Sequence, residues 1–138
     1  MNHNIINLKN NYPFMFSEGA GENKIQELIE IYHDLLSSQY QEFLRFSGGA
    51  VIGAYPVYGV SSVDLMDAHF NTANKVTKKY EEDGMIEKGR FLVISENHAG
   101  DPIYLNLDGS VVESSHDGFQ YKSWENFNEF IKCCAGKS

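Results

Sequence analysis

The chain has 138 residues, 42% of them hydrophobic and 13% aromatic, which suffices for one buried core and argues against disorder. Its 19 acidic residues outnumber its 11 basic ones and give a net charge of -8. This charge argues against nucleic acid or an anionic membrane as partner, since both attract positive charge. It favours a basic partner, although the same acidity could serve only to keep the protein soluble.

The start of the chain, its apolar runs and its cysteines indicate where the protein is located. The stretch Met1–Asn11 is polar, and no apolar run approaches the roughly 20 residues that cross a bilayer. The only cysteines, Cys133 and Cys134, are adjacent, so they make a poor disulfide and a poor zinc site. We interpret them as small apolar residues of a terminal helix, and we expect a cytoplasmic protein.

The first elements are expected to be helical. We predict an irregular lead-in over residues 1–19, before a folded core of about residues 20–134. A helix over Lys24–Leu36 follows, which Asn23 could cap together with Gln26. One apolar stripe at helical spacing gives its buried side: Ile25, Leu28, Ile29, Tyr32, Leu35 and Leu36.

A second, short helix is predicted after Ser38, which could cap it. Tyr40, Phe43 and Leu44 would form its buried side. Gly48-Gly49 would end it, because glycine accepts the left-handed conformation at a helix C-terminus.

Two short strands and a third helix are expected next. Ala50–Ile52 and Pro56–Val60 are β-branched or aromatic and set off by glycines. Ser61 or Ser62 could cap a helix over Val63–Tyr80 with the stripe Val63, Met66, Phe70 and Ala73. The acidic run Glu81-Glu82-Asp83 and Gly84 would close it.

The pattern then changes to that of a sheet. Phe91–Ile94 is a continuous apolar run, typical of a strand covered on both faces. Pro102–Leu107 alternates, Asp108-Gly109 is typical of a two-residue hairpin turn, and Ser110–Ser115 returns.

That hairpin turn fixes a register. If Leu107 pairs with Ser110, then Tyr104 faces Glu113 and Asp101 faces His116.

A last helix is predicted from the cap Ser123 to about Cys134. The order of elements predicts an α+β fold, with N-terminal helices and a C-terminal helix packed on a mainly antiparallel sheet, in one domain over residues 1–138. The buried stripe of the last helix is Trp124, Phe127, Phe130, Ile131 and Cys134.

Three pieces of this order resemble the SUKH superfamily, also called the Smi/Knr family after its yeast cell-wall regulators. They are Tyr40–Gly49, Phe91–Ile94 with Ala99–Leu105, and Val111-Val112 leading to Ser123–Phe130. The resemblance covers about residues 20–134. The chain departs from it at Ser37-Ser38, where the family usually has Leu-Pro, and at Ser47, where it often has an acidic residue.

The resemblance implies an α+β fold and no cofactor. Bacterial members are mostly immunity proteins that bind a cognate toxin, often a nuclease, and eukaryotic members look like interaction modules. We therefore expect a non-catalytic immunity protein whose partner is a basic toxin domain. A general scaffold module is the alternative, and a small metal-dependent enzyme is a third hypothesis.

The candidate site is a set of polar residues around the predicted hairpin and after the third helix. We expect a carboxylate-rich patch on the sheet side to bind the partner, and an open sheet edge could pair two copies. The candidate partner-binding residues are Glu81, Glu82, Asp83, Glu96, Asp101, Tyr104, Asp108, Glu113 and Asp117.

Other interpretations of the same residues stay open. Only Asp101 and His116, with Glu96 or His98, could converge on a metal, because Asp108 lies roughly 20 Å away at the hairpin tip. Asp101 and His116 could equally form a structural pair that closes the hairpin. We expect no catalytic residue, since no nucleophile motif is present.

Overall fold

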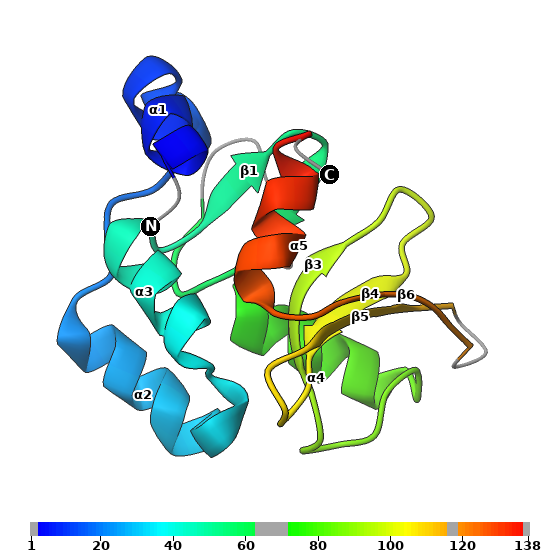
Figure 1. The fold of residues 1–138 in the computed structure, drawn as a ribbon. Coiled ribbons are helices and arrows are strands. Elements are labelled where there is room, and N and C mark those ends of the chain that lie inside the picture. Colours follow the sequence, from blue (N-terminus) through cyan, green and yellow to red (C-terminus); the bar gives the residue numbers. More distant parts are fainter. Residues whose placement is uncertain (1–2, 63–71, 116–118, 137–138) are drawn as a thin grey trace.

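The computed structural model describes residues 3–62, 72–115 and 119–136, and it places a six-stranded antiparallel sheet among helices (Figure 1). The strands follow one another in the sheet in chain order, which confirms the predicted α+β fold. The helices are α1 (His3–Asn11), α2 (Glu22–Tyr32), α3 (Ser38–Phe46), α4 (Ala73–Glu82) and α5 (Phe127–Cys134), with 3-10 turns η1 (Pro13–Met15) and η2 (His33–Leu35). The strands are β1 (Ala50–Ile52), β2 (Tyr55–Val57), β3 (Leu92–Glu96), β4 (Pro102–Leu105), β5 (Val111–Ser114) and β6 (Gln120–Trp124).

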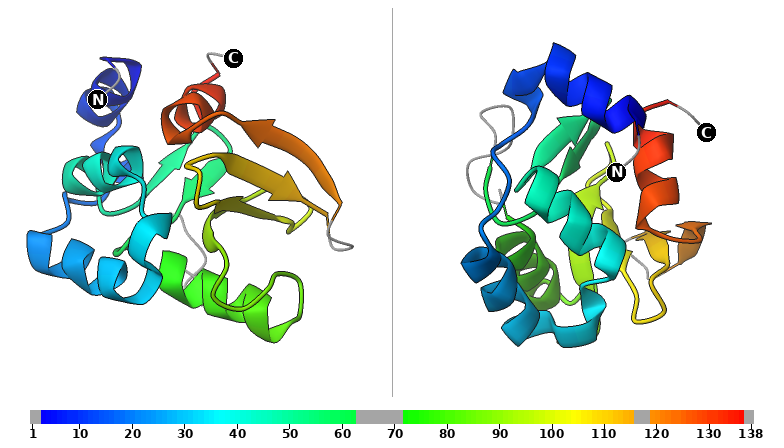
Figure 2. Two further views of the ribbon diagram at one scale, coloured as in Figure 1. Left: turned by 60° about the horizontal axis from the view of Figure 1, so that its bottom comes forward. Right: turned by 60° about the vertical axis from the view of Figure 1, so that its left-hand side comes forward.

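Helices cover both faces of the sheet. Helices α4 and α5 lie on opposite sides of the strands (Figure 2). The side chain of Thr77 in α4 accepts a hydrogen bond from the backbone N–H of Val93 at 2.8 Å. On the other side, the ring of Trp124 at the end of β6 packs edge-on against Phe130 of α5, with centroids 4.9 Å apart. Strand β3 is therefore covered on both faces, as its apolar run predicts.

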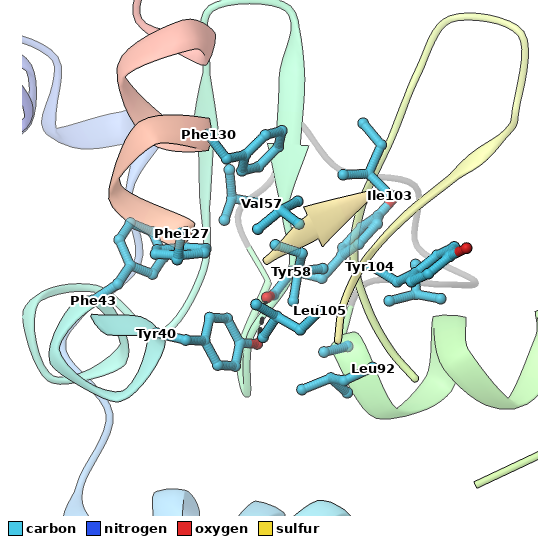
Figure 3. Close-up of a cluster of buried hydrophobic side chains, with 14 of the residues drawn as sticks. Tyr40, Phe43, Val57, Tyr58, Leu92, Ile103, Tyr104, Leu105, Phe127 and Phe130 are labelled. Atoms are coloured by element: carbon cyan, nitrogen blue, oxygen red, sulfur yellow. Dashed lines mark hydrogen bonds between the residues drawn. The ribbon is translucent and has the colours of Figure 1, made fainter. Parts of the chain in front are cut away.

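The core is centred on aromatic residues of α3 and α5 (Figure 3). The ring of Phe127 packs edge-on against Tyr40 and Phe43, at centroid distances of 5.3 and 5.4 Å. The buried hydroxyl of Tyr40 donates to the carbonyl oxygen of Tyr58 at 2.7 Å, so its polar end is satisfied. The predicted stripes of α2, α3 and α5 supply most of this layer, and all their members are buried except the half-buried Ile29 and Trp124.

The lead-in is helical where an irregular segment was expected, so that prediction is wrong for residues 3–11. Ile5 of α1 is 0% exposed, and Lys9 donates to the carbonyl oxygen of Phe46 at 2.5 Å while lying over the Phe46 ring. A helix of nine residues is marginal by itself. These long-range contacts stabilise α1, and the sequence pattern of the segment itself does not predict them.

The predicted caps of α2 and α3 are displaced. Helix α2 begins at Glu22 after Gly21 without a side-chain cap, so Asn23 lies inside the helix. Ser37, not Ser38, caps α3, because its hydroxyl accepts from the N–H of Tyr40 at 3.3 Å. Each error is one or two residues, which is the usual uncertainty at helix ends.

Helix α2 stops before Leu36, the end that its stripe predicts. His33 has φ 52° and ψ −124°, a conformation that L residues rarely adopt, and the chain continues as η2. Leu35 and Leu36 are nevertheless buried. The apolar spacing therefore identifies the buried residues although the helix breaks.

Gly48 and Gly49 do not end α3 through a left-handed conformation, so that prediction is wrong. The helix ends at Phe46, Ser47 is extended, and neither glycine has a positive φ. Gly48 instead permits close packing, since a Cβ there would lie 2.3 Å from Oγ of Ser61.

Of the predicted third helix, residues 63–71 lie outside the described part. Helix α4 begins after Thr72, whose hydroxyl accepts from the N–H of Lys75. It ends at Glu82, two residues beyond the predicted end at Tyr80, and Gly84 follows with φ +75°.

The hairpin between β4 and β5 has a three-residue loop, so the predicted two-residue turn is wrong. Asn106 donates its N–H to the carbonyl of Ser110, and the N–H of Gly109 donates to the carbonyl of Asn106, each at 3.0 Å. Gly109 has φ +88°, as loops of this length require at that position. The register shifts by one residue, and Leu107 at the tip is 71% exposed.

The shifted register changes two predicted pairs. Tyr104 faces Val112, and Glu113 faces Ile103 instead of Tyr104. His116, the predicted partner of Asp101, lies outside the described residues.

Strand β6 is an element that the sequence analysis did not anticipate. Ser123, the predicted cap of the last helix, lies in this strand, and Trp124 ends it half-buried. Asn126 caps α5 by accepting from the N–H of Glu129 at 3.0 Å. Across the described residues, no helix is both long enough and apolar enough to span a membrane.

Candidate functional site

The predicted partner-binding residues fall into three places. Asp108 lies at the tip of the β4–β5 hairpin, and the acidic run of Glu81, Glu82 and Asp83 lies at the end of α4. The remaining described residues lie in or beside the sheet, around the turn that joins β3 to β4. Asp117 lies outside the described residues. The structure does not gather these residues into one patch.

Asp108 has a local structural role. Its Oδ1 accepts from both the hydroxyl and the N–H of Ser110, at 2.6 and 2.9 Å. The hydrogen bond from the Ser110 hydroxyl, with help from the backbone bond, lowers the pKa of Asp108. The carboxylate therefore holds the hairpin loop closed.

The acidic run at the end of α4 is partly engaged within the chain. Oε2 of Glu81 accepts from the N–H of Gly89 at 2.8 Å, which ties the following loop back to the helix. Asp83 forms an ion pair with Lys79 at 2.8 Å. Glu82 is exposed, so among these three it presents the most available charge.

Glu96 lies between two tyrosines that come from different elements. Tyr58, just after β2, donates to Oε1 of Glu96 at 2.5 Å, and Tyr80 of α4 donates to Oε2. The hydroxyl of Tyr80 also lies 2.6 Å from the carbonyl oxygen of Gly100. Burial, followed by the nearby Glu96 carboxylate, raises the pKa of Tyr80, so this phenol keeps its proton. Glu96 thus joins β2, β3 and α4.

Asn97 bridges the two buried carboxylates of this region, and the sequence analysis did not identify it. Its Nδ2 donates to Oε2 of Glu113 at 2.7 Å and lies 3.3 Å from Oδ2 of Asp101. Its Oδ1 accepts from the N–H groups of Ala99 and Asp101, both at 2.9 Å. Asp101 and Glu113 are each 6% exposed. An Asn four residues before an Asp, with Gly100 between them, is the turn signal that could have indicated it.

Tyr104 belongs to the core. It is 4% exposed, its hydroxyl lies 2.7 Å from Oγ of Ser114, and its ring packs on Phe91 at a centroid distance of 4.5 Å. Little of its side chain is available to a partner.

A depression of about 200 Å³ opens beside Glu96. Helix α4, the loop that follows it and the β3–β4 turn form its walls. The lining residues are Val76, Lys79, Tyr80, Asp83, Met85, Glu96 and Gly100.

Exposed negative charge is concentrated on a different part of the molecule. Residues 18–45, which begin just before α2 and end one residue before the end of α3, contain six acidic residues and two basic ones. All six acidic side chains are exposed, in contrast to the buried carboxylates of the sheet. We call this set the α2–α3 acidic surface: Glu18, Glu22, Glu27, Glu30, Asp34 and Glu42.

Two ion pairs are formed on this surface. Arg45 forms an ion pair with Glu22 at 2.8 Å, and Lys24 lies 3.9 Å from Glu27. Exposed pairs of this kind contribute little energy. The net charge of the surface remains negative.

Histidine, cysteine and acidic side chains are spread over several elements in the part of the chain that the structure describes. There, no three His, Cys, Asp or Glu side chains gather in a way that could hold a metal ion. Cys133 and Cys134 are free thiols at the end of α5, and burial raises the pKa of Cys134.

Comparison with known proteins identifies the family. The family model SUKH_5, described as "SMI1-KNR4 cell-wall", matches residues 2–135. This chain belongs to the SUKH_5 family. The resemblance inferred from the three sequence pieces is thereby confirmed, and the match extends over α1, which the resemblance did not cover.

A solved structure supports the SUKH_5 fold. A protein from Pseudomonas syringae pv. tomato, known from a crystal structure, superimposes with a TM-score of 0.62 at 19% sequence identity. The alignment covers 85% of this chain and 83% of that one. At this identity the likeness concerns the fold alone. No curated protein matches the chain.

In this SUKH_5 chain the three pieces have clear positions. Tyr40–Gly49 spans most of α3 and the turn before β1, and it buries Tyr40 and Phe43 in the core. The second piece covers Leu92–Ile94 of β3, the second half of the β3–β4 turn and all of β4. The third covers the first half of β5, the end of β6 and the start of α5. The pieces that carry the resemblance therefore build the core and the sheet.

Proposed function

We propose that this SUKH_5 protein is a non-catalytic immunity protein that binds and neutralises a cognate toxin domain in the cytoplasm. The toxin would be basic, as nuclease domains are, because they bind a polyanion. The observation that carries the proposal is the α2–α3 acidic surface on a chain of net charge -8. Membership of the SUKH_5 family supports it.

The charge supports docking of a protein partner in a specific way. Opposite fields on two proteins accelerate their encounter and orient it, and this effect depends on exposed charge. Carboxylates held inside by hydrogen bonds contribute less, because their lone pairs are used and protein covers them. Asp101 and Glu113, each 6% exposed, are of this second kind.

The difference between exposed and buried carboxylates indicates which surface meets the toxin. We infer that the α2–α3 acidic surface steers the toxin, with Glu82, Asp83 and Asp108 as further exposed contacts. The buried members of the predicted set would act by fixing the shape of the β3–β4 turn. No direct contact with nucleic acid or a membrane is proposed, and no cofactor.

The experiment that tests the proposal is neutralisation. The reading frame beside this gene is examined for a large secreted protein with a basic C-terminal domain, and that domain is expressed with and without this chain. Survival only when the chain is present, together with a stable one-to-one complex, would support the proposal. Equal killing in both strains would contradict it.

A second function is favoured by the description of the family model, "SMI1-KNR4 cell-wall". The chain would then be an interaction module in cell-wall or stress signalling, with several weaker partners. Affinity capture separates the two functions, since an immunity protein retains one tight partner. Gel filtration of the purified chain would show whether an open sheet edge pairs two copies.

A further inference from the structure

The depression beside Glu96 has one apolar part and one polar part. Val76, Met85 and the ring of Tyr80 supply the apolar part. Glu96 and the backbone of Gly100 supply the polar part. Its volume of about 200 Å³ is well above the roughly 10–15 Å³ that one water needs.

The polar part has more acceptors than donors. The hydroxyl of Tyr80 faces two acceptors, Oε2 of Glu96 and the carbonyl oxygen of Gly100, and it has one hydrogen. Tyr58 cannot supply the second hydrogen, since its hydroxyl donates to the other oxygen of Glu96. Whichever acceptor Tyr80 serves, the other requires a donor from outside this group. A partly buried acceptor without a donor costs about 1–3 kcal/mol.

The remaining charges at the depression are balanced locally. The ammonium of Lys79 is 2.8 Å from Oδ2 of Asp83, and this carboxylate raises the pKa of Lys79. With that ion pair neutral overall, Glu96 leaves the lining negative. A cationic donor satisfies both the hydrogen-bond requirement and the charge.

We propose that this depression binds the head group of a lysine or arginine side chain of the partner protein. The ammonium or guanidinium donates to Glu96 and to the carbonyl of Gly100, and the methylene stem packs on Val76 and Met85. The assignment of the cation to a protein side chain rests on the proposed function. It names a specific anchor for a partner that the α2–α3 acidic surface attracts from a distance.

The first test needs no partner. The full-length ¹⁵N- and methyl-labelled chain is titrated at constant ionic strength with n-butylammonium, n-butylguanidinium or neutral n-butanol. We expect saturable shifts of the Gly100 amide and the Val76 and Met85 methyl groups with the two cations only, in the millimolar range. Absence of saturable shifts, or equal shifts with n-butanol, would overturn the proposal.

Matched variants separate the depression from general charge. Glu96→Gln supplies an amide that can donate to Tyr80 and accept from Tyr58, so the fold should be kept while cation affinity falls roughly ten-fold. Glu125→Gln removes the same charge from an exposed residue outside the lining and should bind as the unmodified chain does. Equal affinity in the two variants contradicts the proposal. The titration of the unmodified chain stands even if Glu96→Gln folds poorly.

The partner side chain is tested separately in the survival assay. Weaker protection by Glu96→Gln than by Glu125→Gln, which lies outside the proposed contact residues, supports a basic side chain in the depression. Equal protection overturns that assignment and leaves the immunity function intact. If neither the unmodified chain nor a variant protects, the proposed function fails, and the cation titration still decides whether the depression binds cations.

Discussion

The hydroxyl of Tyr58 lies 2.5 Å from Oε1 of Glu96, although the two residues are 38 positions apart. The tyrosine follows β2 and the glutamate ends β3, so the bond joins neighbouring strands at a place where their ladder has a single paired position, Val57 with Ser95. A hydrogen bond to a carboxylate is stronger than one between neutral groups. It reinforces the junction between β2 and β3 and holds the Glu96 carboxylate that lines the depression.

Tyr58→Phe should lower the free energy of unfolding by about 1.5–3 kcal/mol, the range for a hydrogen bond to a charged group. The aromatic body stays, so loss of the hydroxyl alone is measured. Urea denaturation gives the value. Tyr12→Phe is the control, because Tyr12 is exposed and should change stability by less than about 0.5 kcal/mol. Equal effects would show that the bond contributes nothing specific.

Gly59→Ala should destabilise the protein by about 1–3 kcal/mol through overpacking. A Cβ at this position would lie 2.2 Å from the carbonyl oxygen of Gly48 and 2.6 Å from Cδ2 of Leu44. The matched change is Gly21→Ala, where a Cβ meets nothing within 4 Å. That change should cost less than about 1 kcal/mol, the difference between glycine and alanine before a helix. Thermal unfolding of both variants measures the two effects. Similar unfolding midpoints would refute the expected difference.

Asp108→Asn should have a pH-dependent effect on stability. The folded pKa of Asp108 lies below its ordinary value of 3.8, because the hydroxyl and N–H of Ser110 stabilise the ionised form. The contribution is therefore present above pH 3.8 and is lost as the pH falls through the lower folded value. Asp108 is highly exposed, so the effect should be small.

Unfolding free energies of the unmodified chain and the Asp108→Asn variant are measured between neutral pH and about pH 2. We expect a small deficit for the variant at neutral pH that closes under acid conditions. A deficit that stays constant with pH would mean that ionisation of Asp108 does not matter.

Neutralising the α2–α3 acidic surface should slow association with the toxin more than it speeds dissociation. The change is Glu27→Gln with Glu30→Gln and Asp34→Asn, three exposed residues whose loss leaves the buried stripe of α2 intact. The association rate should fall roughly ten-fold at low salt and by less at high salt, where charges are screened.

Stopped-flow or surface-binding kinetics at two salt concentrations measure that rate. The control removes the same charge elsewhere, by Glu87→Gln, Glu125→Gln and Glu129→Gln. If both triple variants slow association equally, the net charge of the protein steers the partner, and the location of the charges on the α2–α3 acidic surface has no effect.

The chemical type of the candidate site could be predicted from the sequence, but its geometry could not. The carboxylates Glu96, Asp101 and Glu113 were identified by their density around a hairpin. Their partners could not be, because Tyr58, Tyr80 and Asn97 reach them from separate elements. The presence of carboxylates can be read from the sequence, whereas their hydrogen-bond partners depend on which elements become neighbours in the fold.

By itself, the sequence determined the apolar stripes, the α+β class and the resemblance to the SUKH superfamily. Periodic spacing decides which side chains can be buried together, so Ile25, Leu28, Phe127 and Phe130 could be assigned to the core. Only the tertiary structure decided the helix that Ile5 and Lys9 anchor, the one-residue shift of the β4–β5 register, and strand β6. These features depend on contacts between residues far apart in the chain, and such contacts override weak local preferences because burial and hydrogen bonding stabilise more than propensity does.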